Sequence, residues 1–261
     1  MVGGARTGSM GAPPPVLVLP LHEHLAPAVW AAGRERLGLR LGYVQTGGGV
    51  LPGSVSSDVA WLQESGLLVG RLNAEPAHGG EHEAIGLVGA LDAAAGRLGW
   101  KAIVCGPGPG VDGSETRYRH GGMAALESAH AALALGLPTL LSPRLSGSDP
   151  RPGHRGLSEH TSSVLELLLA SVRVPVPEID LEGWPTGDQG PGEVDLPSVL
   201  DALHAVCDNR HDVTVEAVDL EAFAASDLAR ATGRAVEEDP LFFAAPLAAG
   251  AALAKAAPRE G

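Results

Sequence analysis

Short apolar segments alternate with longer amphipathic segments along most of the chain. Between the apolar segments, hydrophobic residues recur at helical spacing, as at Leu87, Leu91, Ala94 and Leu98. The apolar segments are nearly continuous and rich in β-branched residues, which is typical of strands buried on both faces. The pattern predicts strands over 16–21, 40–45, 67–72, 101–105, 137–141, 172–176 and 213–218. It predicts helices over about 24–37, 54–65, 82–98, 121–135, 159–170, 197–207, 219–230 and 240–256.

Residues that favour helix ends support several of these boundaries. The predicted N-caps are Ser54, Ser158 and Asp239, the last followed by Pro240 at the first helical position. The predicted glycines just beyond helix C-termini are Gly66, Gly99 and Gly136. A regular alternation of strand and helix predicts a three-layer α/β/α fold with a mostly parallel, Rossmann-like sheet.

The domain organisation follows from the same alternation. Residues 1–15 lack an apolar core and read as a flexible leader, and 182–193 (EGWPTGDQGPGE) read as a surface loop. Because the alternation resumes after that loop, we expect a single α/β domain over 16–257.

Composition narrows the function classes. The net charge is −13 and no basic stripe is present, so we expect neither nucleic-acid nor membrane-surface binding. The apolar runs are too short to span a bilayer, and Cys105 and Cys207 are too few for a disulfide framework or a cysteine zinc site. We therefore expect a cytoplasmic protein with free thiols.

Glycines, hydroxyls, arginines and histidines follow five of the predicted strands. The carboxyl ends of parallel strands share one edge, where open α/β sheets bind ligands, so we expect a shared pocket for a small anionic ligand. The predicted ligand-binding residues are Thr46, Gly48, Gly106, Gly108, Gly110, Ser114, Thr116, Arg117, Arg155 and Ser158. The predicted acid/base residues are His78, His120 and His160. The alternative for each loop is an ordinary connection without a ligand.

Three motifs carry this expectation. GPGPGVDGSET (106–116) is not a dinucleotide or P-loop fingerprint, but its glycines permit close backbone approach to an anion, as do those of TGGG (46–49). In HRGLSEHT (154–161), Ser158 as N-cap places His160 in the first helical turn, which lowers the pKa of a histidine. The simpler alternative for the last motif is a cap followed by solvated side chains.

The letters HGGEH (78–82) spell an inverted zinc-protease motif, H-x-x-E-H. That chemistry needs both histidines on one helical face, and two consecutive glycines disfavour a helix by about 1 kcal/mol each. We therefore predict a helix that opens near Glu81 and leaves His78 in the preceding loop. His22 and His24 are further candidate metal ligands, but adjacent residues of His-Glu-His cannot all face one point. The chain has no G-x-S-x-G elbow, and Cys105 reads as a buried apolar residue.

The ordered motifs LHEHLAPAV (21–29), GYVQTGGGVLP (42–52), HGGEHEAIG (78–86), GPGPGVDGSET (106–116), HRGLSEHT (154–161) and EEDPLFF (237–243) are similar to those of a known family. The chain resembles the actinobacterial-type domain-of-unknown-function family three-eight-six-six over about residues 16–250. The resemblance implies little about function, and the cofactor stays unknown. It does imply that Gly47, Glu115 and Glu159 depart from family residues at three candidate site positions.

Three hypotheses remain open from the sequence. The first is a small-molecule enzyme or binding protein with an anionic-ligand pocket at the sheet edge. The second is a non-catalytic homo-oligomeric or regulatory module whose apolar segment 240–254 packs on a partner, which exposed Phe242 and Phe243 would favour. The third is a metal-dependent hydrolase.

Overall fold

A computed structural model describes residues 12–49, 51, 55–74, 76–110, 118–179, 196–231 and 234–259. Within these residues one sheet has the strand order β10-β9-β6-β1-β5-β2-β3-β4, and every neighbouring pair in it is parallel. The strands are β1 (Val16–Val18), β2 (Leu41–Thr46), β3 (Arg71–Ala74), β4 (His82–Ala84), β5 (Ala102–Pro107), β6 (Thr139–Leu141), β9 (Arg173–Glu178) and β10 (Asp212–Ala217). A separate antiparallel pair joins β7 (Leu145–Ser146) to β8 (Gly156–Leu157).

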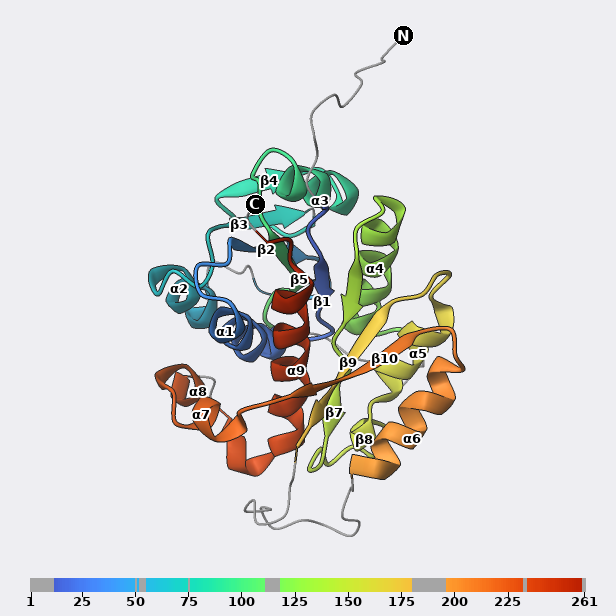
Figure 1. Ribbon diagram of the computed structural model, residues 1–261. Coiled ribbons are helices and arrows are strands. Elements are labelled where there is room, and N and C mark those ends of the chain that lie inside the picture. Colours follow the sequence, from blue (N-terminus) through green and yellow to red (C-terminus); the bar gives the residue numbers. More distant parts are fainter. Residues whose placement is uncertain are drawn as a thin grey trace.

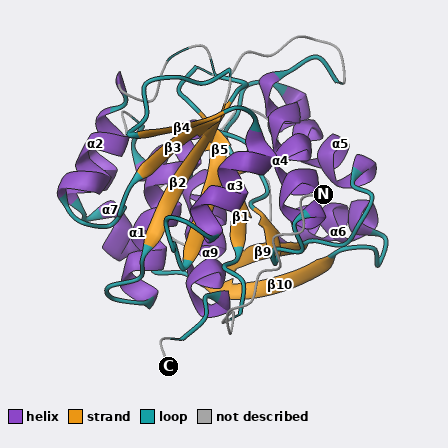
Figure 2. Cartoon of the chain, turned by 90° about the horizontal axis from the view of Figure 1, so that it is seen from above, coloured by secondary structure: helices purple, strands orange, loops and turns teal. Residues whose placement is uncertain are grey.

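Helices cover both faces of the sheet, as Figures 1 and 2 show from two directions. One apolar cluster joins the sheet to α1 (Leu25–Glu35), α2 (Ser57–Glu64), α7 (Leu220–Ala224), α8 (Asp227–Ala231) and α9 (Pro240–Ala256). The cluster on the opposite face contains α3 (Leu87–Ala95), α4 (Ala124–Ala134), α5 (Glu159–Leu167) and α6 (Leu196–Cys207). The predicted three-layer α/β/α fold with a Rossmann-like parallel sheet is confirmed.

Helix α9 is the most buried helix of its layer and lies beside α1 (Figure 1). The two backbones meet at Gly250, where an added Cβ would lie 2.0 Å from the carbonyl oxygen of Ala28. Phe242 and Phe243 are only 5% and 1% exposed. Because their burial is within the monomer, it counts against the oligomeric hypothesis that required them on the surface.

Several predicted helix ends agree with the structure. Ser158 caps α5 by accepting from the backbone N–H of His160, and Asp239 caps α9 by accepting from that of Phe242. Gly66 and Gly136 have the positive φ expected of residues just beyond a helix. The predicted cap Ser54 lies outside the described residues, and Ser56 caps α2. Gly99 also has positive φ, but α3 already ends at Ala95.

The helix predicted over 82–98 is wrong at its start. Residues His82–Ala84 form strand β4, which pairs with β3, and α3 begins only at Leu87. Gly86, with a φ of 85°, redirects the chain between the two elements. A three-residue polar strand at a sheet edge carries no apolar run, so hydrophobic patterning could not predict it.

The connections place a topological switch point next to β1. After β1, a short 3₁₀ turn η1 (His22–His24) leads into α1 on one face. The neighbouring strand β6 continues toward α5 on the opposite face. Sheets of this kind bind ligands at such a switch point, and we call this position the β1–β6 crevice. The 3₁₀ turns η3 (Gly121–Met123), η4 (Pro152–His154) and η5 (Val236–Glu238) precede α4, β8 and α9.

Candidate functional site

Three histidines from two connections, β5 to β6 and β6 to β9, meet at the carboxyl edge of the sheet. His120 precedes η3, His154 ends η4, and His160 lies in the first turn of α5. The His120 and His160 rings are stacked with centroids 3.5 Å apart and planes within 2° of each other. His154 contacts His160 edge-on, at 4.4 Å between centroids. We call these three residues the histidine cluster; the structure brings the predicted pair His120 and His160 together and adds His154.

Local sequence holds the cluster in place. The Ser158 hydroxyl lies 2.8 Å from Nδ1 of His154 and accepts from the backbone N–H of His160 at 3.2 Å. One capping side chain therefore positions two of the three rings. A Cβ on Gly122 would lie 2.9 Å from Nδ1 of His120, so the glycine leaves room for the stacked pair.

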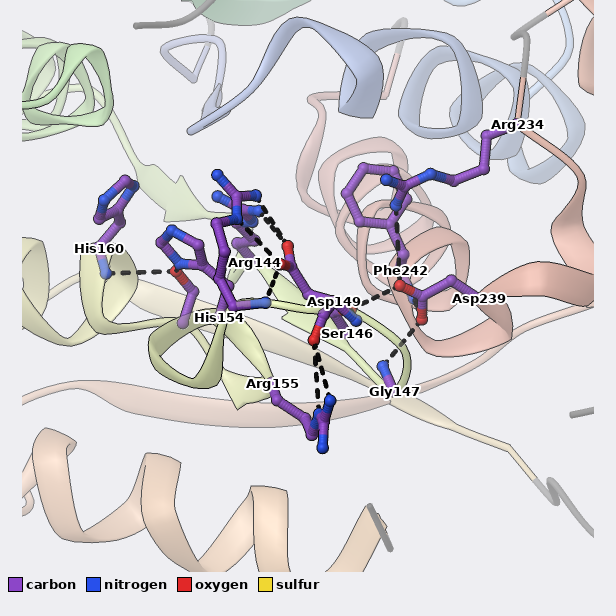
Figure 3. A network of polar contacts seen from close by, with 12 residues as sticks. Arg144, Ser146, Gly147, Asp149, His154, Arg155, His160, Arg234, Asp239 and Phe242 are labelled. Atoms are coloured by element: carbon purple, nitrogen blue, oxygen red, sulfur yellow. Dashed lines mark hydrogen bonds and ion pairs between the residues drawn. The ribbon is translucent and has the colours of Figure 1, made fainter. Parts of the chain in front are cut away.

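An arginine–aspartate network lies beside the histidine cluster (Figure 3). Arg144, which follows β6, donates from Nη2 to Asp149 Oδ2 at 2.7 Å. Arg151 donates to both Asp149 oxygens at 2.9 Å. Burial raises the pKa of the Asp149 carboxyl, but the hydrogen bonds from Arg151 and the charges of both arginines outweigh it and hold that pKa well below its usual range. Two cations thus share one described carboxylate, which leaves local positive charge.

The network continues to α9 through Asp239. This carboxylate is 1% exposed and accepts from the Ser146 hydroxyl at 2.5 Å and from the Gly147 N–H at 2.8 Å. The guanidinium of Arg234 lies 3.7 Å away and also packs over the Phe242 ring. The N-terminus of α9 is therefore tied to the segment that carries the arginine–aspartate network.

The imidazoles of His154 and His160 are held neutral. Burial, together with the charges of Arg144 and Arg151, lowers the pKa of His154 to about 4. Burial, then the neighbouring histidines, then the same arginines lower the pKa of His160 to about 3. Neutral rings can stack without repulsion, and each keeps one nitrogen able to accept a proton or hydrogen bond.

A fourth histidine lies just after β1 and contacts the segment that follows β6. His24 is fully buried, its Nδ1 is 3.4 Å from the Ser142 hydroxyl, and its ring contacts Phe242 edge-on at 5.0 Å. Burial, then the charges of Arg144 and Arg234, lower its pKa to about 3. Among the described residues, neither His24 Nε2 nor Arg144 Nε has a hydrogen-bond partner.

The structure separates Arg155 and His78 from the histidine cluster. Arg155 donates from Nε and Nη2 to the backbone oxygen of Asp149 at 3.4 Å, on the side of the loop away from His160 (Figure 3). His78 is exposed in the loop between β3 and β4, and its backbone oxygen accepts from Asn73. Ser114, Thr116 and Arg117 lie outside the described residues.

The predicted glycine loops contact each other. A Cβ on Gly48 would lie 2.7 Å from the backbone oxygen of Gly121, and one on Gly108 would lie 2.6 Å from that of Leu51. A Cβ on Gly106 would lie 3.0 Å from the Leu19 side chain, and Gly110 has a φ of 79°. The Thr46 hydroxyl donates to the backbone of Gly47. These contacts already explain the need for glycine, so the ligand-binding role of these residues stays a prediction.

The metal-binding hypotheses find no matching geometry in the described ranges. There, no three His, Cys, Asp or Glu side chains are grouped so as to hold a metal ion. In the HGGEH motif, His78 is in a loop and His82 is in β4, so the two histidines do not share a helical face. The prediction that a helix opens near Glu81 is wrong, because the strand β4 follows instead.

The sequence interpretation missed the charged centre of this site. Arg144, Asp149 and Asp239 are buried, and no periodicity indicates which polar loop residues fold inward. A usable signal existed for His24 and Arg144, since each closely follows a predicted strand that borders the crevice.

The comparisons with known proteins agree with the motif resemblance. The model of a family described as "Protein of unknown function (DUF3866)" matches residues 9–250. No curated protein and no solved structure matches the chain. Among the described helices, none is long and apolar enough to cross a membrane. Because the family match extends over most of the chain, the chain belongs to the DUF3866 family.

Proposed function

We propose that this protein binds a small anionic ligand in the β1–β6 crevice, as a cytoplasmic small-molecule enzyme or binding protein built as one α/β domain over 16–257. The observation that carries the proposal is the position of neutral histidines beside the buried Arg144, in a network whose second cation, Arg151, is exposed. Arg144 and Arg151 share Asp149 as their described carboxylate partner. A carboxylate or phosphate group would balance the remaining charge.

The unused donors favour the same class of ligand. His24 Nε2 and Arg144 Nε are buried and lack described partners, and an unsatisfied buried donor costs about 1–3 kcal/mol. If the Ser142 hydroxyl donates to His24 Nδ1, the proton of that ring is on Nε2. Both unused groups are then donors, which an oxyanion would satisfy.

An anion would also activate the histidine cluster. Negative charge raises the pKa of a nearby imidazole. Ligand binding would therefore raise the pKa of His154 from about 4, and that of His160 from about 3, toward neutral pH. With its pKa in that range, His160 suits general acid/base catalysis, the role predicted from the sequence for His160 and His120. The protein would then become competent for proton transfer only when the anion is bound.

A ligand screen followed by NMR tests the proposal. Thermal shift with inorganic phosphate, nucleotides and small carboxylates should identify anions that stabilise the wild type by about 2.7 kcal/mol at a hundred times their Kd. Histidine ring signals should then show a raised pKa for His160, and Arg144→Met should abolish both effects. His204→Gln, at an exposed histidine of α6, is the matched control. The proposal is wrong if no anion changes the melting temperature or the His160 signals.

A further inference from the structure

A second group of buried polar residues lies on β2 and β3, two strands away from β1. The strand register pairs Tyr43 with Arg71 and Gln45 with Asn73. Alternate residues of neighbouring strands share a face, so these four side chains lie together, on the face covered by α1 and α2. All four are at most 8% exposed. Central strands covered by helices normally bury apolar residues there.

Arg71 is a buried cation without a described counterion. Its Nη2 donates to the backbone oxygen of Gly79, and it forms no ion pair with any carboxylate that the structure describes. Its Nε also lacks a partner among these residues. A buried charge left in this state is strongly unfavourable unless an opposite charge joins it.

The neighbouring amides have acceptors to spare. Within the described residues, Gln45 Oε1 and Asn73 Oδ1 accept no hydrogen bond, although Asn73 Nδ2 donates to the His78 backbone at 2.7 Å. The loop after β3 closes onto this spot, since a Cβ on Gly80 would lie 2.5 Å from Asn73 Oδ1. The face thus presents one cationic donor and two amide acceptors, each buried and unused.

We propose that Arg71, Gln45 and Asn73 form a second ligand site, for a small molecule that carries an anionic oxygen group beside hydroxyl groups. The anionic group, a carboxylate or phosphate, would pair with Arg71. The hydroxyl groups would donate to the two amide oxygens. Strand β5 lies between this site and β1, which borders the β1–β6 crevice, so the proposal does not depend on the histidine cluster.

The test uses the full chain and probes that differ by one feature. Glycerol 3-phosphate and glycerate carry both required groups, inorganic phosphate carries only the anion, and glycerol carries only the hydroxyls. Isothermal titration should show the first two binding more tightly than phosphate, with no binding of glycerol. Arg71→Met should weaken the binding of glycerol 3-phosphate and of glycerate by at least tenfold. Asn73→Leu should reduce the affinity for glycerol 3-phosphate to the affinity for inorganic phosphate. Arg97→Met, at an exposed arginine after α3, should change neither.

The stability of the ligand-free variants separates ligand binding from a structural role. If Arg71 serves a ligand, Arg71→Met should melt at or above the wild-type temperature in a buffer without anions. A lower melting temperature, with no probe bound by the wild type at millimolar concentration, would overturn the proposal. If the variants do not fold, the Arg71 Nε–H signal of the wild type still tests it, and an unmoved signal at saturating probe refutes it. Unchanged glycerol 3-phosphate binding by His160→Gln would show that this site stands apart from the crevice.

Discussion

Lowering the pH below 6.5 should destabilise the protein, and we expect His24 to account for a large part of that loss. The imidazole is fully buried, and burial with the charges of Arg144 and Arg234 lowers its pKa to about 3. In the unfolded chain the same ring takes up a proton near pH 6.5. The unfolded state therefore binds more protons between these two pH values, and stability falls as the pH falls through that range.

The magnitude follows from the size of this window. Each pKa unit is worth about 1.4 kcal/mol, so His24 should cost about 2 kcal/mol of stability at pH 5 and about 3 kcal/mol at pH 4. Above pH 6.5 its contribution is constant. Replacing His24 by leucine keeps an apolar contact with Phe242 and removes the titrating group.

Urea unfolding at several pH values measures the effect. The difference in free energy of unfolding between the wild type and His24→Leu should move by about 3 kcal/mol in favour of the variant from pH 7 to pH 4. His154, His160 and Asp149 titrate in both proteins, so the difference isolates His24. His204→Leu, at an exposed position, should parallel the wild type. If His24→Leu also parallels the wild type, the buried ring is not held neutral and the reasoning fails.

Three further predictions, made with four substitutions, test the packing of the chain. Asp239→Ala should lower the free energy of unfolding, measured with urea, by about 1–3 kcal/mol for each donor that loses this acceptor, the Ser146 hydroxyl and the Gly147 N–H. Gly250→Ala should lower the melting temperature steeply, because its Cβ would overlap a backbone oxygen of α1, whereas Gly89→Ala, with open space around it in α3, should stabilise by about 0.5–1 kcal/mol. Equal effects would refute the close helix crossing. Gly122→Ala should unstack the histidine cluster and change its ring NMR signals, while unchanged signals would argue against the stacked arrangement.

The fold could be predicted because its strands are buried on both faces. Such strands are short apolar runs, and the longer amphipathic segments between them allow few topologies other than a parallel sheet with helices on both sides. Strand β4 and the β7–β8 pair escaped prediction for the opposite reason. They are two or three residues long and are specified by pairing with other segments, not by their own hydrophobicity.

For the site, the sequence predicts only the edge of the sheet at which it lies. Parallel strands bring His120 and His160 to the same edge whatever the details of their loops. The sequence cannot show which polar residues are buried there, because burial depends on contacts between loops far apart in the chain. Ser146 and Asp239 are 93 positions apart and still share a hydrogen bond. The sequence also cannot show whether a loop glycine makes room for a ligand or for another loop. Gly48 is required by a contact with another loop.

The His-Glu-His turn after β1 connects the two regions that carry the proposals. His24 points toward β6 and contacts Ser142. His22 lies on the side of α2. Its Nδ1 is 3.2 Å from the Pro107 backbone oxygen, and its Nε2 is 2.8 Å from the Ser56 hydroxyl. The His22 ring lies 6.5 Å from that of Tyr43, at the border of the Arg71 face. A single turn of 3₁₀ helix thus places one neutral imidazole beside each polar region.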